Sequence, residues 1–204
     1  IIGYLELLKN ENKLTPEEKE DIIAQIEYNN REMFNIINLI LEFSKTENYQ
    51  MKIDINPISV LDLLEKIIQN FEMIARTKDI DMRLTLQKTF FVYADKGKLE
   101  ILLTNLISNS LKYTDSGFIE IDVSENQSGF TFSIKDSGRG IKKEEQSKIF
   151  EVYQRGSQIG STQGTGIGLA FCKIITQAHQ GKIWVESEGI NKGSTFYFYI
   201  PRLK

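Results

Sequence analysis

The sequence predicts an α+β protein in which a helical hairpin precedes a two-layer α/β sandwich with a largely antiparallel sheet. Apolar residues between positions 15 and 45 recur at spacings of three and four, which is typical of a helix packed lengthwise against others. Beyond residue 57, helical segments are mixed with segments of alternating polarity, which is the pattern of paired strands. The chain of 204 residues is 41% hydrophobic and 26% charged, a composition of folded domains rather than of disorder.

Residues 1–46 are predicted to be the hairpin, and their first nine residues are interpreted as the end of a helix that begins upstream. Thr15 and Pro16 then supply an N-cap and a first helical position for a second helix, which runs to about Lys45. Its apolar stripe is wider than a two-stranded seam requires. This width favours a dimer whose two hairpins form a four-helix bundle; the alternative is a hairpin that packs on its own globular domain.

The rest of the chain divides into a short connection and a globular domain. Residues 47–56 are predicted to be a linker with a first short strand at 51–55, and residues 57–204 to be the domain. We expect helices at 59–76, capped by Ser59, and at 95–112 and 166–179. We expect strands at 80–86, 91–94, 118–124, 130–136, 182–187 and 194–200.

Charge and residue usage exclude several functions. With 25 basic and 28 acidic residues the net charge is −3, without the basic surplus that a nucleic-acid binder needs. No apolar run reaches the roughly 18 residues of a membrane helix, and we expect neither a signal peptide nor direct membrane contact from this segment. One cysteine (Cys172) and one histidine (His179) leave no zinc cluster, so a bound metal would be a hard cation held by oxygens.

Two polar segments are candidates for chemistry. On the predicted helix 95–112, Asn105, Asn109 and Lys112 share one face, and two amides with an ammonium suit a magnesium–triphosphate group. The segment 136–141 ends a strand with the carboxylate of Asp136, an acceptor suited to an exocyclic amino group, followed by glycines that let a flat group approach. A solvated amide pair and a simple turn are the structural alternatives.

A third candidate is the glycine-rich stretch between Gly156 and Gly168, which runs into a predicted helix. Bare backbone N–H groups at a helix N-terminus bind phosphates, whereas the alternative interpretation is a surface loop.

In this order and spacing, the segments resemble the catalytic core of sensor histidine kinases of two-component systems. The matching residues are 105–114 (N box), 136–141 (first glycine box), 150–153 (F box), 164–170 (second glycine box) and 193–196. The resemblance implies that the hairpin is the dimerisation and phosphotransfer hairpin. It also implies that residues 57–204 are the ATP-binding catalytic domain, with the fold shared by gyrase and heat-shock chaperone ATPases.

The resemblance also implies a role for each matching position. Asp136 would bind the adenine amino group, Gly138 and Gly140 would line the base, and Thr195 would join the hydrogen bonds around it. Asn109 would coordinate Mg²⁺ with support from Asn105, Lys112 would bind the phosphates, and Tyr113 would pack on the nucleotide; Asn105 and Lys112 are the catalytic candidates. The other expected nucleotide contacts are Ile141, Phe150, Arg155, Gln163, Gly164, Thr165, Gly166, Ile167, Gly168 and Leu169. Residues 137–165 would form a lid anchored by Phe150.

The implied activity is that of a cytoplasmic protein histidine kinase that uses ATP and Mg²⁺. It would act as a homodimer and would pass phosphate through a His to an Asp on a response-regulator receiver domain. The phosphoacceptor His that precedes a stretch like Ile2-Gly3-Tyr4 would lie upstream of Ile1, so this segment alone is not expected to autophosphorylate, and His179 is interpreted as structural.

Three alternatives stay open: an ATPase of the same fold, a serine kinase of the anti-sigma type, and a nucleotide-binding scaffold without catalysis. Those ATPases carry a Glu where Asn105 stands, and an amide cannot act as general base on water. This position favours phosphoryl transfer over hydrolysis.

Overall fold

A computed structural model describes residues 51–86, 89–151 and 167–202, with eight scattered positions between Thr15 and Met33. The elements follow in the order β1 (Asn56–Ser59), α3 (Val60–Gln69), α4 (Glu72–Thr77), β2 (Ile80–Leu84), β3 (Phe91–Ala94), α5 (Lys96–Tyr113), β4 (Gly117–Glu125), β5 (Gly129–Asp136), α6 (Lys143–Gln146), α7 (Gly168–Ala178), β6 (Lys182–Glu186) and β7 (Ser194–Pro201). The predicted hairpin, as a whole, lies outside the described residues.

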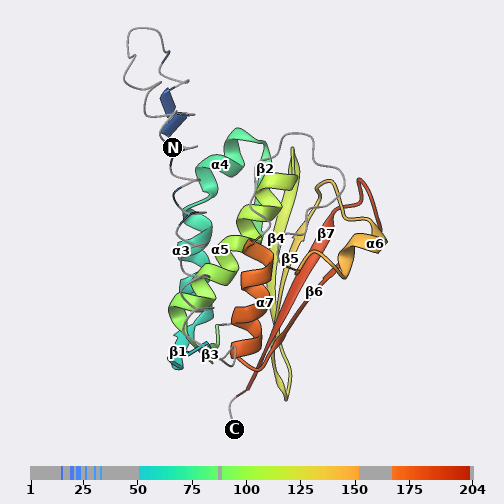
Figure 1. Ribbon diagram of the computed structural model, residues 1–204. Coiled ribbons are helices and arrows are strands. Elements are labelled where there is room, and N and C mark those ends of the chain that lie inside the picture. Colours follow the sequence, from blue (N-terminus) through green and yellow to red (C-terminus); the bar gives the residue numbers. More distant parts are fainter. Residues whose placement is uncertain are drawn as a thin grey trace.

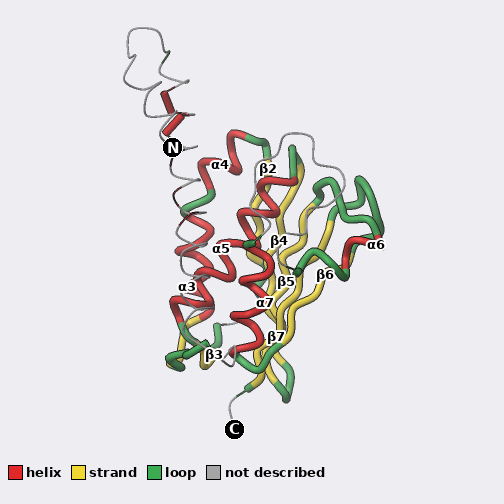
Figure 2. Tube along the Cα trace, viewed as in Figure 1, coloured by secondary structure: helices red, strands yellow, loops and turns green. Residues whose placement is uncertain are grey.

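The described part of the chain forms two layers. Five strands in the order β2-β4-β5-β7-β6 make one sheet, in which β2 and β4 are parallel and the other pairs antiparallel. Helices α3, α5 and α7 cover one face of this sheet (Figure 1), and the helical and strand layers are separated by colour in Figure 2. The predicted sandwich with a largely antiparallel sheet is therefore confirmed.

The core lies between these layers because the strands alternate in polarity. Along β7, the buried residues alternate with half-buried ones, and β4 alternates in the same way. Phe132 of β5 and Phe198 of β7 stack with ring centroids 4.4 Å apart, and both are fully buried. The alternation fixes which side chains of β5 and β7 face the helices, and this decides the composition of the site described below.

Two predicted elements differ from the structure. Residues 51–55 form no strand; the strand is β1, which pairs with β3 so that the buried residues Ile58 and Val92 lie opposite each other. The helix expected at 59–76 is divided into α3 and α4 by a turn at Asn70 and Phe71. Phe71 is buried at this turn, and the periodicity does not reveal the break because Asn is tolerated within helices at modest cost.

The N-cap predicted at Ser59 is confirmed, and the structure adds a second N-cap at Asp95. The side chain of Ser59 accepts a hydrogen bond from the Asp62 N–H at the start of α3, and Asp95 accepts one from the Lys98 N–H at the start of α5. Among the helices that the structure describes, none combines the length and apolarity needed to cross a bilayer.

Candidate functional site

The carboxylate of Asp136 is the most unusual polar group at the end of the central strands. It is only 4% exposed, yet it accepts four hydrogen bonds within the described part of the chain. Its Oδ1 atom accepts from the backbone N–H groups of Gly138 (3.0 Å) and Ser194 (3.2 Å). Its Oδ2 atom accepts from the hydroxyls of Ser194 (2.7 Å) and Ser110 (3.5 Å).

Two opposing effects act on the protonation of Asp136. Burial raises the pKa of this carboxyl above its ordinary value, and this is the larger effect. The hydrogen bonds from Ser194, Gly138 and Ser110 favour the ionised form and lower the pKa in part. All four bonds donate to the carboxyl, so Asp136 is an acceptor within the protein, and its contact with an adenine amino group stays a prediction.

The first wall of the site is the segment after Asp136, which lies against the end of α5. The Arg139 N–H donates to the carbonyl of Tyr113 at 3.1 Å. A Cβ atom added to Gly138 would overlap that same carbonyl oxygen. Gly138 therefore has no side chain because the chain's own backbone fills the space.

The second wall is the loop between β6 and β7. The Gly193 N–H donates to the Gly138 carbonyl (3.0 Å), and the Ser187 hydroxyl accepts from the Ile141 N–H (3.0 Å) while donating to the Gly193 carbonyl (2.7 Å). Gly140 has a φ of 66°, and a Cβ there would overlap the carbonyl of Gly189. The sequence predicts that both glycines make room for a flat ligand. The structure shows that backbone carbonyls occupy the space of a side chain at both positions, and their contact with a base stays a prediction.

The three polar residues of α5 are not equivalent. Asn105 is buried and faces α7: its Nδ2 donates to the Ile101 carbonyl at 3.0 Å, and its Oδ1 would lie 3.0 Å from a Cβ on Gly168. Asn109 and Lys112 are half-buried on the same helix. The Lys112 ammonium lies 5.2 Å from the centroid of the Tyr113 ring.

The candidate metal ligands are thus amides, and of these Asn109 is the more accessible. Among the described residues, no group of three or more His, Cys, Asp or Glu side chains is gathered to hold a metal ion. The metal roles of Asn105 and Asn109 stay predictions.

The prediction for Thr195 needs correction. Because β7 alternates, Thr195 lies on the face of the strand opposite to Ser194, and the hydroxyl that reaches Asp136 is that of Ser194. Sequence reasoning missed both Ser194 and Ser110. The signal for Ser194 was available, since it shares the period of two with the buried Phe196, Phe198 and Ile200.

The remaining predicted contacts are largely apolar packing residues. Phe150 is buried, and its ring meets that of Phe196 edge-on with centroids 6.4 Å apart. Ile167 is buried beside the start of α7, and Ile141 and Leu169 are partly buried against the same core. The predicted contacts Arg155, Gln163, Gly164, Thr165 and Gly166 lie outside the described residues.

His179 has a structural role, as the sequence predicted. It is buried at the end of α7; its Nε2 accepts from the Asp95 N–H (3.0 Å), and its Nδ1 pairs with the Ile175 carbonyl (2.8 Å). The neutral tautomer with the proton on Nδ1 satisfies both contacts. Since Asp95 caps the start of α5 and Ser110 lies near its other end, the helix separates His179 from Asp136 by about 20 Å.

Comparison with known proteins gives the family of this domain. Residues 94–204 match the family described as histidine kinase-, DNA gyrase B-, and HSP90-like ATPase, and the chain belongs to it. Within this family it is the catalytic domain of a sensor histidine kinase.

Three sensor histidine kinases illustrate the similarity. The adaptive-response sensory kinase SasA of Synechocystis sp. is 32% identical over 98% of this chain and 53% of its own length. The sensor histidine kinase WalK of Bacillus subtilis is 34% identical over 83% of this chain and 28% of its own length. The structure of histidine kinase ThkA in complex with the response regulator protein TrrA has a TM-score of 0.69 at 25% identity, covering 99% of this chain and 57% of ThkA. The chain thus spans about half of SasA and a smaller share of WalK.

Proposed function

We propose that this chain binds Mg-ATP and is the kinase core that phosphorylates a His belonging to the longer protein. One observation carries the proposal: the buried Asp136 carboxylate, placed by Gly138 and Ser194 as an acceptor at the end of β5. An adenine amino group is an N–H donor, which a carboxylate can accept, and the long 3.5 Å bond from Ser110 is the contact it would replace. Asp136 would therefore select the base.

The donor set of α5 fits the other end of the nucleotide. Asn109 supplies an amide oxygen, which suits Mg²⁺, and Lys112 supplies a positive charge for phosphate oxygens. Mg²⁺, when bound, would neutralise part of the phosphate charge. Asn105, in contact with the start of α7, would hold the two helices in register at the phosphate end. Tyr113 would pack on the nucleotide.

Phosphoryl transfer is favoured over hydrolysis by position 105. Asn105 cannot take a proton from water, and its Nδ2 already donates to the Ile101 carbonyl. Catalysis would then consist mainly of positioning and charge stabilisation.

The proposal extends to the longer protein. Residues 1–46 would be part of a dimerisation and phosphotransfer hairpin, 47–56 the linker, and 57–204 the ATP-binding domain. Phosphate would pass from the upstream His to an Asp of a receiver domain, and this relay is supported by the pairing of ThkA with the response regulator TrrA. The kinase core would work as a homodimer in the cytoplasm.

Two measurements test the proposal. Isothermal titration of the 204-residue chain should give ATP binding that depends on Mg²⁺ and exceeds GTP binding. A longer chain that restores the upstream helix and its His should acquire acid-labile phosphate from γ-labelled ATP. A folded chain that binds no nucleotide would refute the proposal.

A further inference from the structure

Lys78, which follows α4, contacts the end of a different helix. Its Nζ atom donates to the carbonyl of Leu111 at 2.7 Å and to that of Thr114 at 3.1 Å. Both carbonyls belong to the C-terminal end of α5, where the helix itself offers them no partner. An ammonium there also meets the negative end of the helix dipole. The Lys78 side chain therefore caps the C-terminus of α5, the helix that carries the proposed phosphate and metal ligands.

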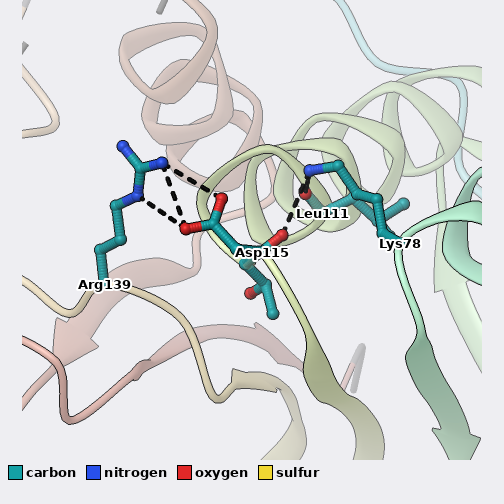
Figure 3. Close-up of polar contacts among 5 residues, drawn as sticks. Lys78, Leu111, Asp115 and Arg139 are labelled. Atoms are coloured by element: carbon teal, nitrogen blue, oxygen red, sulfur yellow. Dashed lines mark hydrogen bonds and ion pairs between the residues drawn. The ribbon is translucent and has the colours of Figure 1, made fainter. Parts of the chain in front are cut away.

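The turn after α4 is held against the turn after α5 by more than this side chain. Asp79 adopts a left-handed φ of 53°, and its carbonyl accepts from the Gly117 N–H at 3.1 Å. Beside this contact, Arg139 pairs with Asp115 through N–O distances of 3.1 to 3.4 Å (Figure 3). The backbone between Tyr113 and Gly117 is thus fixed by contacts from two other segments.

The two side-chain contacts differ in strength. Arg139 and Asp115 have side chains that are 47% and 72% exposed, so water and salt screen their attraction. Lys78 is half-buried, and its partner Leu111 is buried. A helix carbonyl that loses a partner in such surroundings is costly to leave unpaired. Lys78 is thus the stronger of the two restraints on this turn.

A short series of contacts joins this turn to the adenine acceptor. Tyr113, between the two carbonyls that Lys78 binds, accepts from the Arg139 N–H, and its carbonyl fills the space beside Gly138. The Gly138 N–H in turn donates to Oδ1 of Asp136. Because the Tyr113 carbonyl lies beside Gly138 and accepts from the next N–H along the chain, we expect a shift of this carbonyl to displace Gly138 as well.

We infer that Lys78 is a positioning residue of the nucleotide site, which sets the place of the Asp136 acceptor through Tyr113 and Gly138. The inference rests on the proposed nucleotide binding. It assigns the effect of Lys78 to the base and not to the phosphates, so its removal weakens adenosine, ADP and ATP by the same factor.

The test compares Lys78→Met with Lys78→Arg in the 204-residue chain. We expect Lys78→Met to raise the Kd of adenosine, ADP and Mg-ATP about tenfold, the scale of a lost hydrogen bond from a charged donor. Lys78→Arg keeps a charged donor and should restore most of the affinity. The backbone N–H of Arg139 donates a hydrogen bond to the Tyr113 carbonyl. Its hydrogen exchange should be faster in Lys78→Met than in the parent and close to the parent rate in Lys78→Arg.

The control is Lys66→Met, which removes the exposed ion pair of Lys66 with Glu100 (3.1 Å) on α3 and α5. It should leave all three affinities and the Arg139 exchange unchanged. If Lys78→Met does not fold, Lys78→Gln, which keeps one weaker donor, is measured by the same criteria. A folded Lys78→Met or Lys78→Gln variant with unchanged affinities and unchanged Arg139 exchange would overturn the inference, even though the parent chain binds ATP. A parent chain that binds no nucleotide would instead refute the proposed function.

Discussion

Replacing Asp136 by Asn separates nucleotide recognition from folding. The remaining amide oxygen can still accept from the N–H groups of Gly138 and Ser194. The new NH₂ group can donate to the hydroxyl oxygens of Ser194 and Ser110, since a hydroxyl both donates and accepts. We therefore expect the variant to fold with all four contacts retained.

The pH dependence of stability gives the sign of the effect on folding. Because burial raises the pKa of Asp136, the native protein holds this proton more tightly than the unfolded chain does. The ordinary pKa of this carboxyl is 3.8. As the pH rises from that value through the raised pKa of the native state, Asp136 lowers the free energy of unfolding. The Asn variant lacks this titration. It should be at least as stable as the parent at pH 7 and should lose its relative advantage below pH 4.

The affinity for ATP should fall in the Asn variant, although its stability at pH 7 should not. The amide presents a donor where the adenine amino group needs an acceptor, and a lost charge-assisted hydrogen bond costs about 1.5–3 kcal/mol. This corresponds to a rise in the Kd of ATP of roughly 10- to 150-fold. GTP should be weakened less, because guanine carries a carbonyl where adenine carries its amino group, so GTP has no N–H at that position to donate to the carboxylate and loses no such hydrogen bond.

Two experiments on Asp136→Asn decide the matter. Calorimetric titrations with Mg-ATP and Mg-GTP give the affinities, and urea unfolding between pH 3 and pH 8 gives the difference in stability from the parent. Ser194→Ala is a useful companion, because it removes the shortest hydrogen bond to Asp136 but keeps the carboxylate. Equal losses for ATP and GTP in a folded Asp136→Asn variant would place the base elsewhere.

Three further predictions follow from named contacts. Gly138→Ala should destabilise the fold by about 1–3 kcal/mol, because its methyl group overlaps the Tyr113 carbonyl. Gly97→Ala, where the nearest atom is 3.6 Å away in the first turn of α5, should stabilise it by up to ~1 kcal/mol; thermal unfolding of both variants tests the pair, and equal effects would contradict the packing argument. Asn109→Asp should nearly abolish Mg-ATP binding by calorimetry, because a carboxylate changes the charge beside the phosphates, and unchanged affinity would remove Asn109 from the metal site. The 204-residue chain with γ-labelled ATP should gain no acid-labile phosphate on His179, whose two nitrogens are both engaged, and mass spectrometry of its peptide would reveal any exception.

The sequence singled out Asp136 as a candidate acceptor because the relevant signals are local. Asp136 ends a run of alternating polarity and is followed two residues later by Gly138, and no distant contact is needed to recognise this pattern. His179 was likewise recognised as structural from its place between a helix and a strand. The predicted N-cap Ser59 is also a local feature, since its side chain accepts from an N–H three residues away.

The tertiary structure decided what depends on register and on contacts between distant segments. Ser194, and not Thr195, meets Asp136, because one step along β7 reverses the face of the sheet, and the partner is 58 residues away. Lys78 binds carbonyls 33 and 36 residues further along the chain, and no spacing in the sequence marks that pairing. A glycine in a sequence shows that a side chain is missing, but it does not show which atoms occupy the space. At Gly138 only the tertiary structure reveals that the Tyr113 backbone lies there.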